Sequence, residues 1–321
     1  MRILVTGVTG FVGGHLAESL LAAGGAEVCG IARRRDWPAE WRHLAANVVL
    51  HAADLVDSEC VESVLRTVAP NQIYHLAGYA QTGQSFREPD AAWAGNLTGT
   101  RSLYDAVIRW GGKPRIVFVS SGLIYSMSEH PGQPVNEETP FRPVSPYAAS
   151  KAAADLLSYQ MTRHPGLEIV TVRPFNQIGP RQSSQFAVGS FARQLARIER
   201  GLDEPRLETG DLSAKRDLTD VRDMVEAYRA AMESGESGEA YNAGTGTAVS
   251  MQEVVDGLCA LCLKRVEVVT KTERLRPADA AVVVADATKL RTATGWEPRY
   301  SLRQTLCDTL DYWRGATASD M

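Results

Sequence analysis

Three glycines spaced three residues apart follow a short apolar run at the amino terminus, and they constrain the fold more than any other stretch. Residues 3–6 read as a strand, Gly7, Gly10 and Gly13 follow, and helically spaced leucines lead to a second strand candidate at residues 27–32. Glycines permit a tight turn and a close approach of backbone N–H groups to a pyrophosphate, and a helix N-terminus favours the same anion. A glycine pattern alone also fits a simple turn. Its place between a strand and a helix predicts a βαβ unit that binds a dinucleotide.

The residues after the second strand bear on the choice of cofactor. A site that prefers NAD usually places an Asp or Glu there to accept from the ribose 2′-hydroxyl. Here Ala32 is followed by Arg33, Arg34 and Arg35, with no acid among them. Guanidinium groups suit a 2′-phosphate, so the sequence favours NADP(H), and NAD(H) stays possible. The alternative interpretation is a solvated basic loop.

Strand and helix patterns continue to alternate after this unit. Further strand candidates are residues 48–50, 72–78, 115–121 and 168–173. Such alternation predicts an α/β fold, a doubly wound parallel (Rossmann) sheet with helices on both faces. Ligands of these sheets lie at the carboxyl ends of the strands. The residues that fall at or just beyond those ends are Gly7, Ala77, Ser121 and Tyr147.

The pattern changes after Pro174, where loops lengthen and Gly, Pro and Arg become frequent. We therefore expect a smaller C-terminal lobe that binds substrate. The expected boundaries are 1–173 for the cofactor domain, with 237–262 returning to it, and 174–236 with 263–321 for the lobe. Within the returning segment, Ser250 and Glu253 have the spacing of a capping box that opens a helix.

Tyr147 and Lys151 lie four residues apart at the start of a helical pattern that opens with Pro146. Residues at this spacing share one face of a helix. A positive charge beside a phenol favours the phenolate and lowers the tyrosine pKa from about 10. Tyr147 would then be a proton donor or acceptor near neutral pH. The alternative is an ordinary helix with a surface lysine.

A second helical pattern, from Pro89 to Trp110, contains Asn96 and Gly99 in its middle. Both residue types lower helix stability, which indicates close packing or a polar role. His75 lies inside an apolar run, and we interpret it as a packed side chain without a catalytic role.

Composition excludes several functional classes. The 321 residues are 44% hydrophobic and 22% charged, with a formal net charge of -4. This balance does not favour nucleic acid or an anionic membrane as a partner. No apolar run reaches the roughly 18 residues of a transmembrane helix. The amino terminus reads as a strand and not as a signal peptide.

Five scattered cysteines indicate free thiols and a cytoplasmic location. Cys259 and Cys262 have the C-x-x-C spacing, but a second pair is missing and the motif lies in an apolar helical pattern. We expect them to pack in a core and expect no metal site.

Taken together, these motifs resemble the extended short-chain dehydrogenase/reductase family that modifies nucleotide sugars, over nearly the whole chain. The motifs that carry the likeness are Thr6-Gly7-x-x-Gly10-Phe11-Val12-Gly13, Asp54-Leu55, His75-Leu76-Ala77-Gly78, Asn96 with Gly99-Thr100, Ser120-Ser121 before Tyr125, Tyr147/Lys151, Arg173-Pro174-Phe175-Asn176, Arg216-Asp217 and Tyr241-Asn242. A closer likeness, to GDP-4-keto-6-deoxy-D-mannose reductases, rests on residues 175–180, 210–223 and 275–277.

The resemblance implies a role for each matching residue. Tyr147 would protonate the sugar oxygen, Lys151 would bind the nicotinamide ribose and lower the Tyr147 pKa, and Ser121 would hydrogen-bond the reacting carbonyl. Cofactor contacts are expected from Gly7, Gly10, Phe11, Val12, Gly13, Arg33, Arg34, Asp54, Leu55, Leu76, Ala77, Gly78, Asn96, Tyr147 and Lys151. Substrate contacts are expected from Ser121, Asn176, Arg181, Arg216, Arg276 and Asp279, with the arginines suited to the diphosphate.

Two departures from the family pattern affect the expected reaction. The related 4,6-dehydratases carry two acids where this chain has Gly122 and Leu123, so water elimination is disfavoured. Ser126 stands where the family often has glycine. The resemblance thus implies NADPH-dependent reduction of GDP-4-keto-6-deoxy-D-mannose to GDP-D-rhamnose, with GDP-6-deoxy-D-talose as the other C4 epimer. Open alternatives are a nucleotide-sugar epimerase or 4,6-dehydratase with a retained cofactor, and a non-catalytic module that senses NADP.

Family likeness also implies a homodimer. Members commonly associate through a four-helix bundle, which the helices from Pro89 and from Pro146 would supply. Small side chains would permit close packing there: Ala148, Ala149, Ala152, Ala153 and Ala154. The alternative is that these alanines pack inside one subunit.

Overall fold

Seven parallel strands form the central sheet of the computed structural model, which describes residues 1–125, 132–271 and 282–319. The strands are β1 (Arg2–Thr6), β2 (Glu27–Ala32), β3 (Val48–Ala52), β4 (Gln72–His75), β5 (Arg115–Val119), β6 (Glu168–Pro174) and β10 (Ala240–Ala243). Their order is β10-β6-β5-β4-β1-β2-β3, and every pairing is parallel. Central strands are buried on both faces, as a sheet covered by helices requires. The predicted doubly wound sheet is confirmed.

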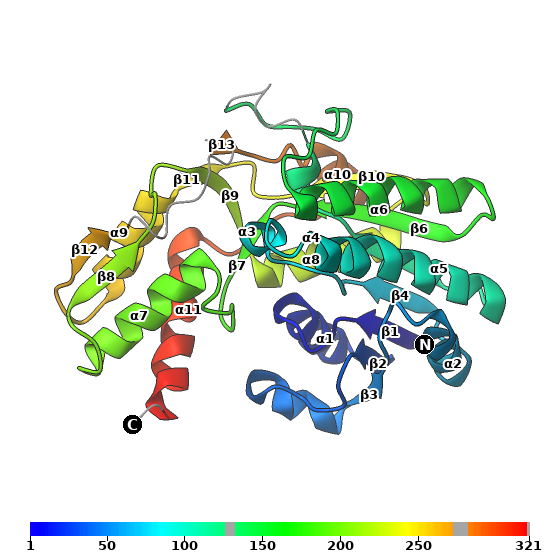
Figure 1. The fold of residues 1–321 in the computed structure, drawn as a ribbon, viewed down its shortest axis with the longest axis horizontal. Helices are drawn as coiled ribbons and strands as arrows, with labels where there is room; N and C mark the ends of the chain where they lie inside the picture. The colour runs from blue at the N-terminus through cyan, green and yellow to red at the C-terminus, as the bar shows by residue number, and fades with distance from the viewer. Residues whose placement is uncertain (126–131, 272–281, 320–321) are drawn as a thin grey trace.

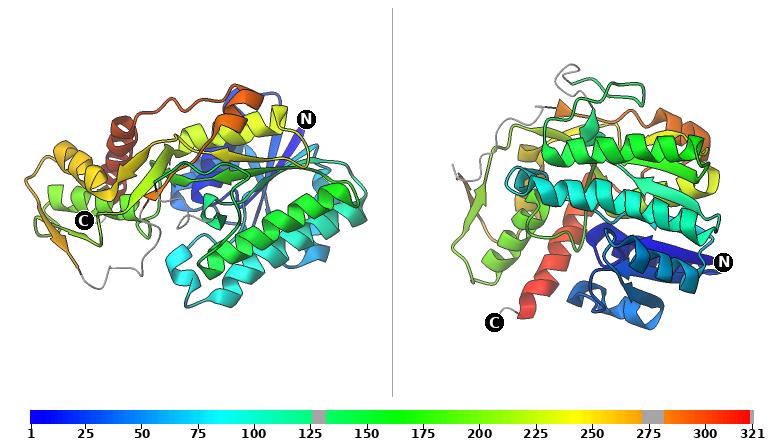
Figure 2. Two further views of the ribbon diagram at one scale, coloured as in Figure 1. Left: turned by 90° about the horizontal axis from the view of Figure 1, so that it is seen from above. Right: turned by 45° about the vertical axis from the view of Figure 1, so that its right-hand side comes forward.

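Helices cover both faces of this sheet (Figure 1). One layer contains α2 (Ser58–Val68), α4 (Pro89–Trp93), η2 (Ala94–Thr98), α5 (Gly99–Trp110) and α6 (Pro146–Arg163). The other contains α1 (Phe11–Ala23), η1 (Ala39–Ala46), α8 (Val221–Ser234) and α10 (Thr288–Thr294). In the right view of Figure 2, α5 and α6 run side by side, with the strands behind them. The expected helix from Pro89 to Trp110 is present, and η2 is a π turn within it.

A smaller lobe lies beside the sheet, at the left of Figure 1. Its helices are α7 (Ala187–Glu199), α9 (Met251–Leu261) and α11 (Leu302–Ala316), which share one core. Its strands are β7 (Asn176–Ile178), β8 (Arg206–Thr209), β9 (Lys215–Asp220), β11 (Ala248–Ser250), β12 (Glu267–Thr270) and β13 (Val282–Val283). β9 is the centre of a four-stranded sheet with β7, β11 and β13, and β8 pairs with β12.

The packing divides the chain differently from the expected boundaries. α8 falls in the range expected for the lobe, yet Met224 and Tyr228 pack in the core beneath the central sheet. α9 falls in the range expected to return to that sheet, yet Val254 and Leu258 pack with α7 and α11. Only β10 of that range joins the main sheet. Both helices are amphipathic, and a sequence pattern does not specify which surface covers an apolar face.

The expected capping box and the expected packing of the cysteines are confirmed. Ser250 and Glu253 form the capping box at the start of α9. Cys259 and Cys262 pack against the core of the lobe, and all five cysteines are free thiols. Within residues 1–125, 132–271 and 282–319, no helix has the length and apolarity needed to cross a membrane, and no cluster of three potential metal ligands occurs.

Candidate active site

The glycine turn joins β1 to α1 and leaves donors free at the start of the helix. Gly7 has φ +73°, a conformation that favours glycine, and its carbonyl accepts from the Gly10 N–H at 2.9 Å. A Cβ at Gly13 would overlap the Gly7 carbonyl, so only glycine lets the helix approach this closely. Gly10 is the N-cap and supplies no side-chain acceptor to the first turn, which contains no acidic residue. First-turn N–H groups, at Phe11 and Val12, can therefore hold an anion.

Asn96 lies in the π turn and is almost fully buried. Its Oδ1 accepts from the Tyr79 N–H at 2.8 Å, and its Nδ2 donates to Ser150 Oγ at 2.9 Å. A Cβ at Gly78 would overlap Asn96 Oδ1 and would lie 3.6 Å from Lys151 Nζ. The expected polar role of Asn96 is thus a structural connection between the end of β4 and helix α6.

Lys151 and Tyr147 share one face of α6 close to Ser121, which follows β5. The ammonium of Lys151 donates to the Val119 carbonyl at 2.9 Å, and the side chain is 6% exposed. The Tyr147 phenol lies close enough to the Ser121 hydroxyl for that hydroxyl to affect its pKa, and Ser121 Oγ accepts from the Leu123 N–H at 3.2 Å. The three residues expected to be catalytic therefore come together at the carboxyl end of the central strands.

The electrostatics of this trio correct one expectation. Burial raises the pKa of Tyr147, while the nearby Ser121 hydroxyl acts in the opposite direction. Lys151 is not among the groups that lower this pKa, and its ammonium donates to the Val119 carbonyl. Burial also lowers the Lys151 pKa to about 8, against an opposing effect of Asp155. The phenol is consequently in its protonated form at neutral pH, which suits a proton donor.

His75 is a packed residue, as expected. Its Nδ1 lies 2.8 Å from Thr6 Oγ1 and its Nε2 lies 2.9 Å from Thr100 Oγ1. Because the Thr100 hydroxyl donates to the Asn96 carbonyl at 2.5 Å, it accepts from Nε2–H and leaves Nδ1 as an acceptor. Burial lowers the His75 pKa to about 3, so the ring is neutral. It joins the ends of β1 and β4 to the π turn.

The other expected cofactor residues lie around the same end of the sheet. Arg33 and Arg34 are exposed and directly follow β2. Asp54 is exposed beyond β3 and accepts from the Val56 N–H at 3.1 Å, whereas Leu55 is buried. Leu76 and Ala77 are partly buried against the two layers of core beside the sheet.

The expected substrate residues are distributed over the lobe side. Asn176 opens β7 and pairs in register with Leu218. Arg216 lies on β9, where its guanidinium donates to the Lys215 carbonyl at 2.8 Å. Arg276, Asp279 and Ser126 lie outside the described residues.

Arg181 is directed toward α1. Its guanidinium pairs with Glu18 at 3.0 Å and lies 4.4 Å from the ring centroid of Trp41. Both partners belong to the cofactor domain, so Arg181 connects the lobe to the helical layer beneath the sheet. The structure does not place it with the Tyr147 group.

Two features of the site were not predicted from the sequence. One is a buried ion pair, in which Arg173 donates to both carboxylate oxygens of Asp155 at 2.8 and 2.9 Å. Arg173 also donates to the Tyr125 hydroxyl at 2.8 Å, which in turn donates to Asn242 at 2.7 Å. The spacing of Asp155 four residues after Lys151 was the available clue. The other feature is Ser85, whose hydroxyl contacts the Tyr147 amide.

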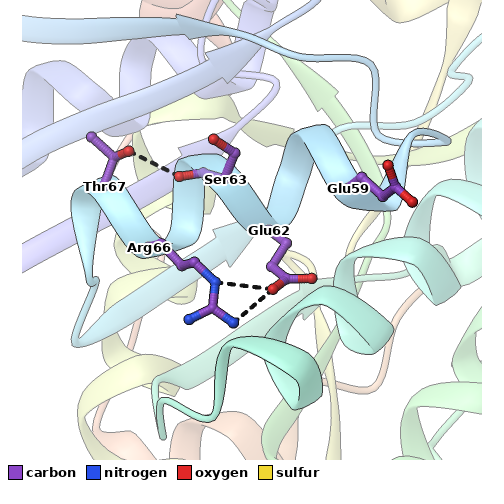
Figure 3. A pocket seen from close by; sticks show the side chains of 5 residues that line it. All are labelled: Glu59, Glu62, Ser63, Arg66 and Thr67. Carbon is purple, nitrogen blue, oxygen red and sulfur yellow. Dashed lines mark hydrogen bonds and ion pairs between the residues drawn. The ribbon is translucent and has the colours of Figure 1, made fainter.

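Two surface pockets lie elsewhere. One, of about 470 Å³, is lined only by residues of α2, and Figure 3 shows Glu62 bonded to Arg66 within it. The other, of about 710 Å³, lies between α1, α8 and the C-terminal lobe and includes Arg181 and Tyr300. Neither is lined by Ser121, Tyr147 or Lys151.

Comparison with known proteins places this geometry in a family. Residues 4–309 match the family described as GDP-mannose 4,6 dehydratase. The GDP-6-deoxy-D-mannose reductase of Pseudomonas aeruginosa is 33% identical, over 97% of each chain. The UDP-glucose 4-epimerase of Bacillus subtilis is 30% identical, over 98% of this chain and 96% of its own.

Solved structures give the same result. RMD from Pseudomonas aeruginosa complexed with NADPH superimposes with a TM-score of 0.84 at 32% identity, covering 98% of this chain and 99% of that one. The UDP-glucose 4-epimerase of Thermus thermophilus in complex with NAD gives 0.86 at 33% identity, covering 98% and 100%. The resemblance found in the sequence is confirmed, and the chain belongs to the extended short-chain dehydrogenase/reductase family of nucleotide-sugar enzymes.

Proposed function

We propose that this protein is an NADPH-dependent 4-ketoreductase that converts GDP-4-keto-6-deoxy-D-mannose to GDP-D-rhamnose. The observation that carries the proposal is the composition of the site. Tyr147 is a protonated phenol close to the Ser121 hydroxyl, and residues 122 and 123 offer no acid. A Cβ at Gly122 would lie 2.7 Å from the Phe175 ring, so this position has no room for the acidic side chain of a dehydratase.

The cofactor fits the features of the turn and of the strand ends. Free N–H groups at the start of α1 suit the pyrophosphate, and the missing Cβ atoms at Gly7 and Gly13 leave the backbone accessible. Ser120 Oγ is buried without a hydrogen-bond partner among the described residues, beside the catalytic trio. Bound NADPH would supply the hydride that reduces the C4 ketone.

The residues of the chain supply the proton and hold the sugar. Tyr147 donates its phenolic proton to the C4 oxygen, and the Ser121 hydroxyl donates a hydrogen bond to the same oxygen. Lys151, which carries a positive charge below about pH 8, is proposed to bind the hydroxyls of the nicotinamide ribose. Asn176 and Arg216, with Arg276 and Asp279, are proposed to hold the GDP-linked part of the substrate.

The experiment is incubation with NADPH and GDP-4-keto-6-deoxy-D-mannose, followed by loss of cofactor absorbance and by NMR of the C4 configuration. Tyr147→Phe should lower kcat about 10²–10⁴-fold while cofactor binding persists. Tyr300→Phe is the control, because Tyr300 is exposed and lies outside the helices proposed to associate. Retained activity in Tyr147→Phe would remove the proposed role of that residue.

An epimerase is the second candidate, favoured by the likeness to UDP-glucose 4-epimerases. An epimerase recycles its cofactor, so it predicts a tightly co-purifying nucleotide and no net oxidation of added NADPH. Thermal protection by GDP over UDP or dTDP would support the proposed substrate class. Stronger protection by UDP, together with unchanged NADPH, would favour the epimerase.

We further propose a preference for NADPH over NADH, supported by the position of Arg33 and Arg34 after β2. Replacing both by alanine should weaken NADPH binding about tenfold or more and leave NADH binding unchanged. Arg265→Ala, an exposed change in the lobe, is the control. An equal loss of affinity for NADPH and for NADH would contradict the proposed preference for NADPH.

A cytoplasmic homodimer completes the proposal. The five free thiols suit a reducing compartment. Trp93, Ile108, Leu156 and Tyr159 are exposed on α4, α5 and α6, which supports association through these helices. Ala148, Ala152 and Ala154 are buried within the subunit and would not form that contact. A light-scattering mass equal to one chain would remove the dimer.

A further inference from the structure

Ser85 ends the short helix α3 (Thr82–Ser85) and is fully buried. Its hydroxyl donates to the Thr82 carbonyl at 2.6 Å and accepts from the Tyr147 N–H at 3.2 Å. The two residues of the second contact are 62 positions apart in the chain. A buried hydroxyl with both of these bonds connects the loop after β4 to the backbone of the catalytic tyrosine.

The start of α6 depends on this contact. Pro146 has no N–H, and the Ala148 N–H is bonded to Ser145 Oγ at 3.1 Å. The Ala149 N–H bonds to the Ser145 carbonyl at 2.9 Å. Tyr147 therefore carries the one N–H of this first turn that Ser145 does not serve, and its acceptor comes from a distant segment.

The contact also closes a ring of hydrogen bonds. Tyr79, at the other end of the same loop, donates its N–H to Asn96 Oδ1 at 2.8 Å. Asn96 Nδ2 donates to Ser150 Oγ at 2.9 Å, and Ser150 Oγ donates to the Tyr147 carbonyl at 2.8 Å. The Tyr147 N–H is thus bonded to Ser85, which belongs to the loop 79–85. The Tyr147 carbonyl is bonded to Ser150, whose hydroxyl is held by Asn96.

We propose that Ser85 is a positioning residue for Tyr147, which fixes the depth and direction of the phenol relative to Ser121. This inference rests on the proposed role of Tyr147 as the proton donor. Without the Ser85 hydroxyl, the first turn of α6 can shift and the phenol can move away from the Ser121 hydroxyl. A misplacement of about 1 Å in a catalytic group costs about 10²-fold in rate.

The test is Ser85→Ala in the full-length protein. We expect kcat to fall about 10–100-fold, while the Kd for NADPH changes by less than about twofold. Because the nearby Ser121 hydroxyl lowers the Tyr147 pKa, moving the phenol away from it should shift the alkaline limb of the kcat profile to higher pH. The thiol introduced by Ser85→Cys is a weak acceptor, so this variant should also shift the alkaline limb to higher pH, with a smaller loss of kcat. Ser85→Cys replaces Ser85→Ala in the test if the alanine variant does not fold.

Ser158→Ala is the matched control. Ser158 is also fully buried, bonds a backbone carbonyl at 2.7 Å, and lies on the same helix about three turns from Tyr147. It should lower the melting temperature and leave both kcat and the alkaline limb in place. The proposal fails if Ser85→Ala lowers stability and kcat no more than Ser158→Ala does and leaves the alkaline limb of the kcat profile at the same pH. Ser85 would then be only structural.

A second readout separates this inference from the proposed reaction. With [13Cζ]tyrosine and saturating NADP⁺, the Tyr147 resonance is identified by its absence in Tyr147→Phe. Its titration should move to higher pH in Ser85→Ala. An unchanged titration overturns the positioning role even where the ketosugar is not a substrate. A shifted titration supports it independently of the substrate.

Discussion

Replacing Lys151 by methionine should abolish activity and also change how stability depends on pH. The side chain is 6% exposed, and burial lowers its pKa from 10.5 to about 8, against the opposing effect of Asp155. The ammonium retains one hydrogen bond, to the Val119 carbonyl at 2.9 Å, and lies 5.5 Å from the Phe118 ring centroid. The charged form of Lys151 therefore lowers the free energy of unfolding.

The size of this cost follows from the pKa difference. A decrease from 10.5 to about 8 corresponds to about 3 kcal/mol lost by the folded state while the lysine is protonated. Because the pKa is lower in the folded state, the folded protein holds fewer protons between about pH 8 and 10.5, and wild-type stability rises across that window. Methionine removes this rise. It also leaves the Val119 carbonyl without its donor, which costs about 1–3 kcal/mol at every pH.

The two effects nearly cancel at neutral pH. The informative quantity is therefore the change in the free energy of unfolding with pH. Between about pH 7 and pH 9.5, the free energy of unfolding of the variant should fall by about 2 kcal/mol relative to that of wild type, measured by reversible urea unfolding. Lys113→Met is the control, since Lys113 is exposed and its loss should not alter the slope. A variant with the same pH dependence as wild type would refute the claim that Lys151 is held charged at a cost.

Two further substitutions test the turn and the buried ion pair. Gly13→Ala should abolish NADPH binding, measured by cofactor fluorescence, because its Cβ would overlap the carbonyl at the start of the turn; Gly315→Ala, with open space around it, should bind normally. Asp155→Asn should lower the free energy of unfolding by about 3–5 kcal/mol, because it leaves the Arg173 guanidinium buried and undercompensated. Asp203→Asn removes an exposed pair and should cost less than about 1 kcal/mol. Equal losses in the two aspartate variants would contradict the buried-pair argument.

Much of the fold could be predicted because its main signals are local. Apolar runs bounded by turns identified the strands of the central sheet that precede the lobe, and the glycine spacing identified the βα turn at Gly7. The division into lobes could not be predicted in the same way. α8 and α9 are both amphipathic helices, and only their packing reveals that α8 covers the central sheet and α9 covers the lobe.

The candidate site divides along similar lines. The identities of Ser121, Tyr147 and Lys151 followed from motif spacing, and the structure brings them together as expected. Their ionisation did not follow, because the pKa of Tyr147 depends on burial, which spacing does not report. Arg181 was expected near substrate from its position in a motif, and it is directed to Glu18 on α1.

The sequence by itself determined the parallel sheet, the cofactor turn and the residue types available for chemistry. These depend on periodicity and on residues with special backbone freedom, and both act over a few neighbouring positions. Only the tertiary structure decided that the Tyr147 amide is held by Ser85, from 62 residues earlier in the chain. It also decided that Asp155 is paired with Arg173. Such contacts are made between segments whose approach is set by the packing of the whole layer, so no local pattern records them.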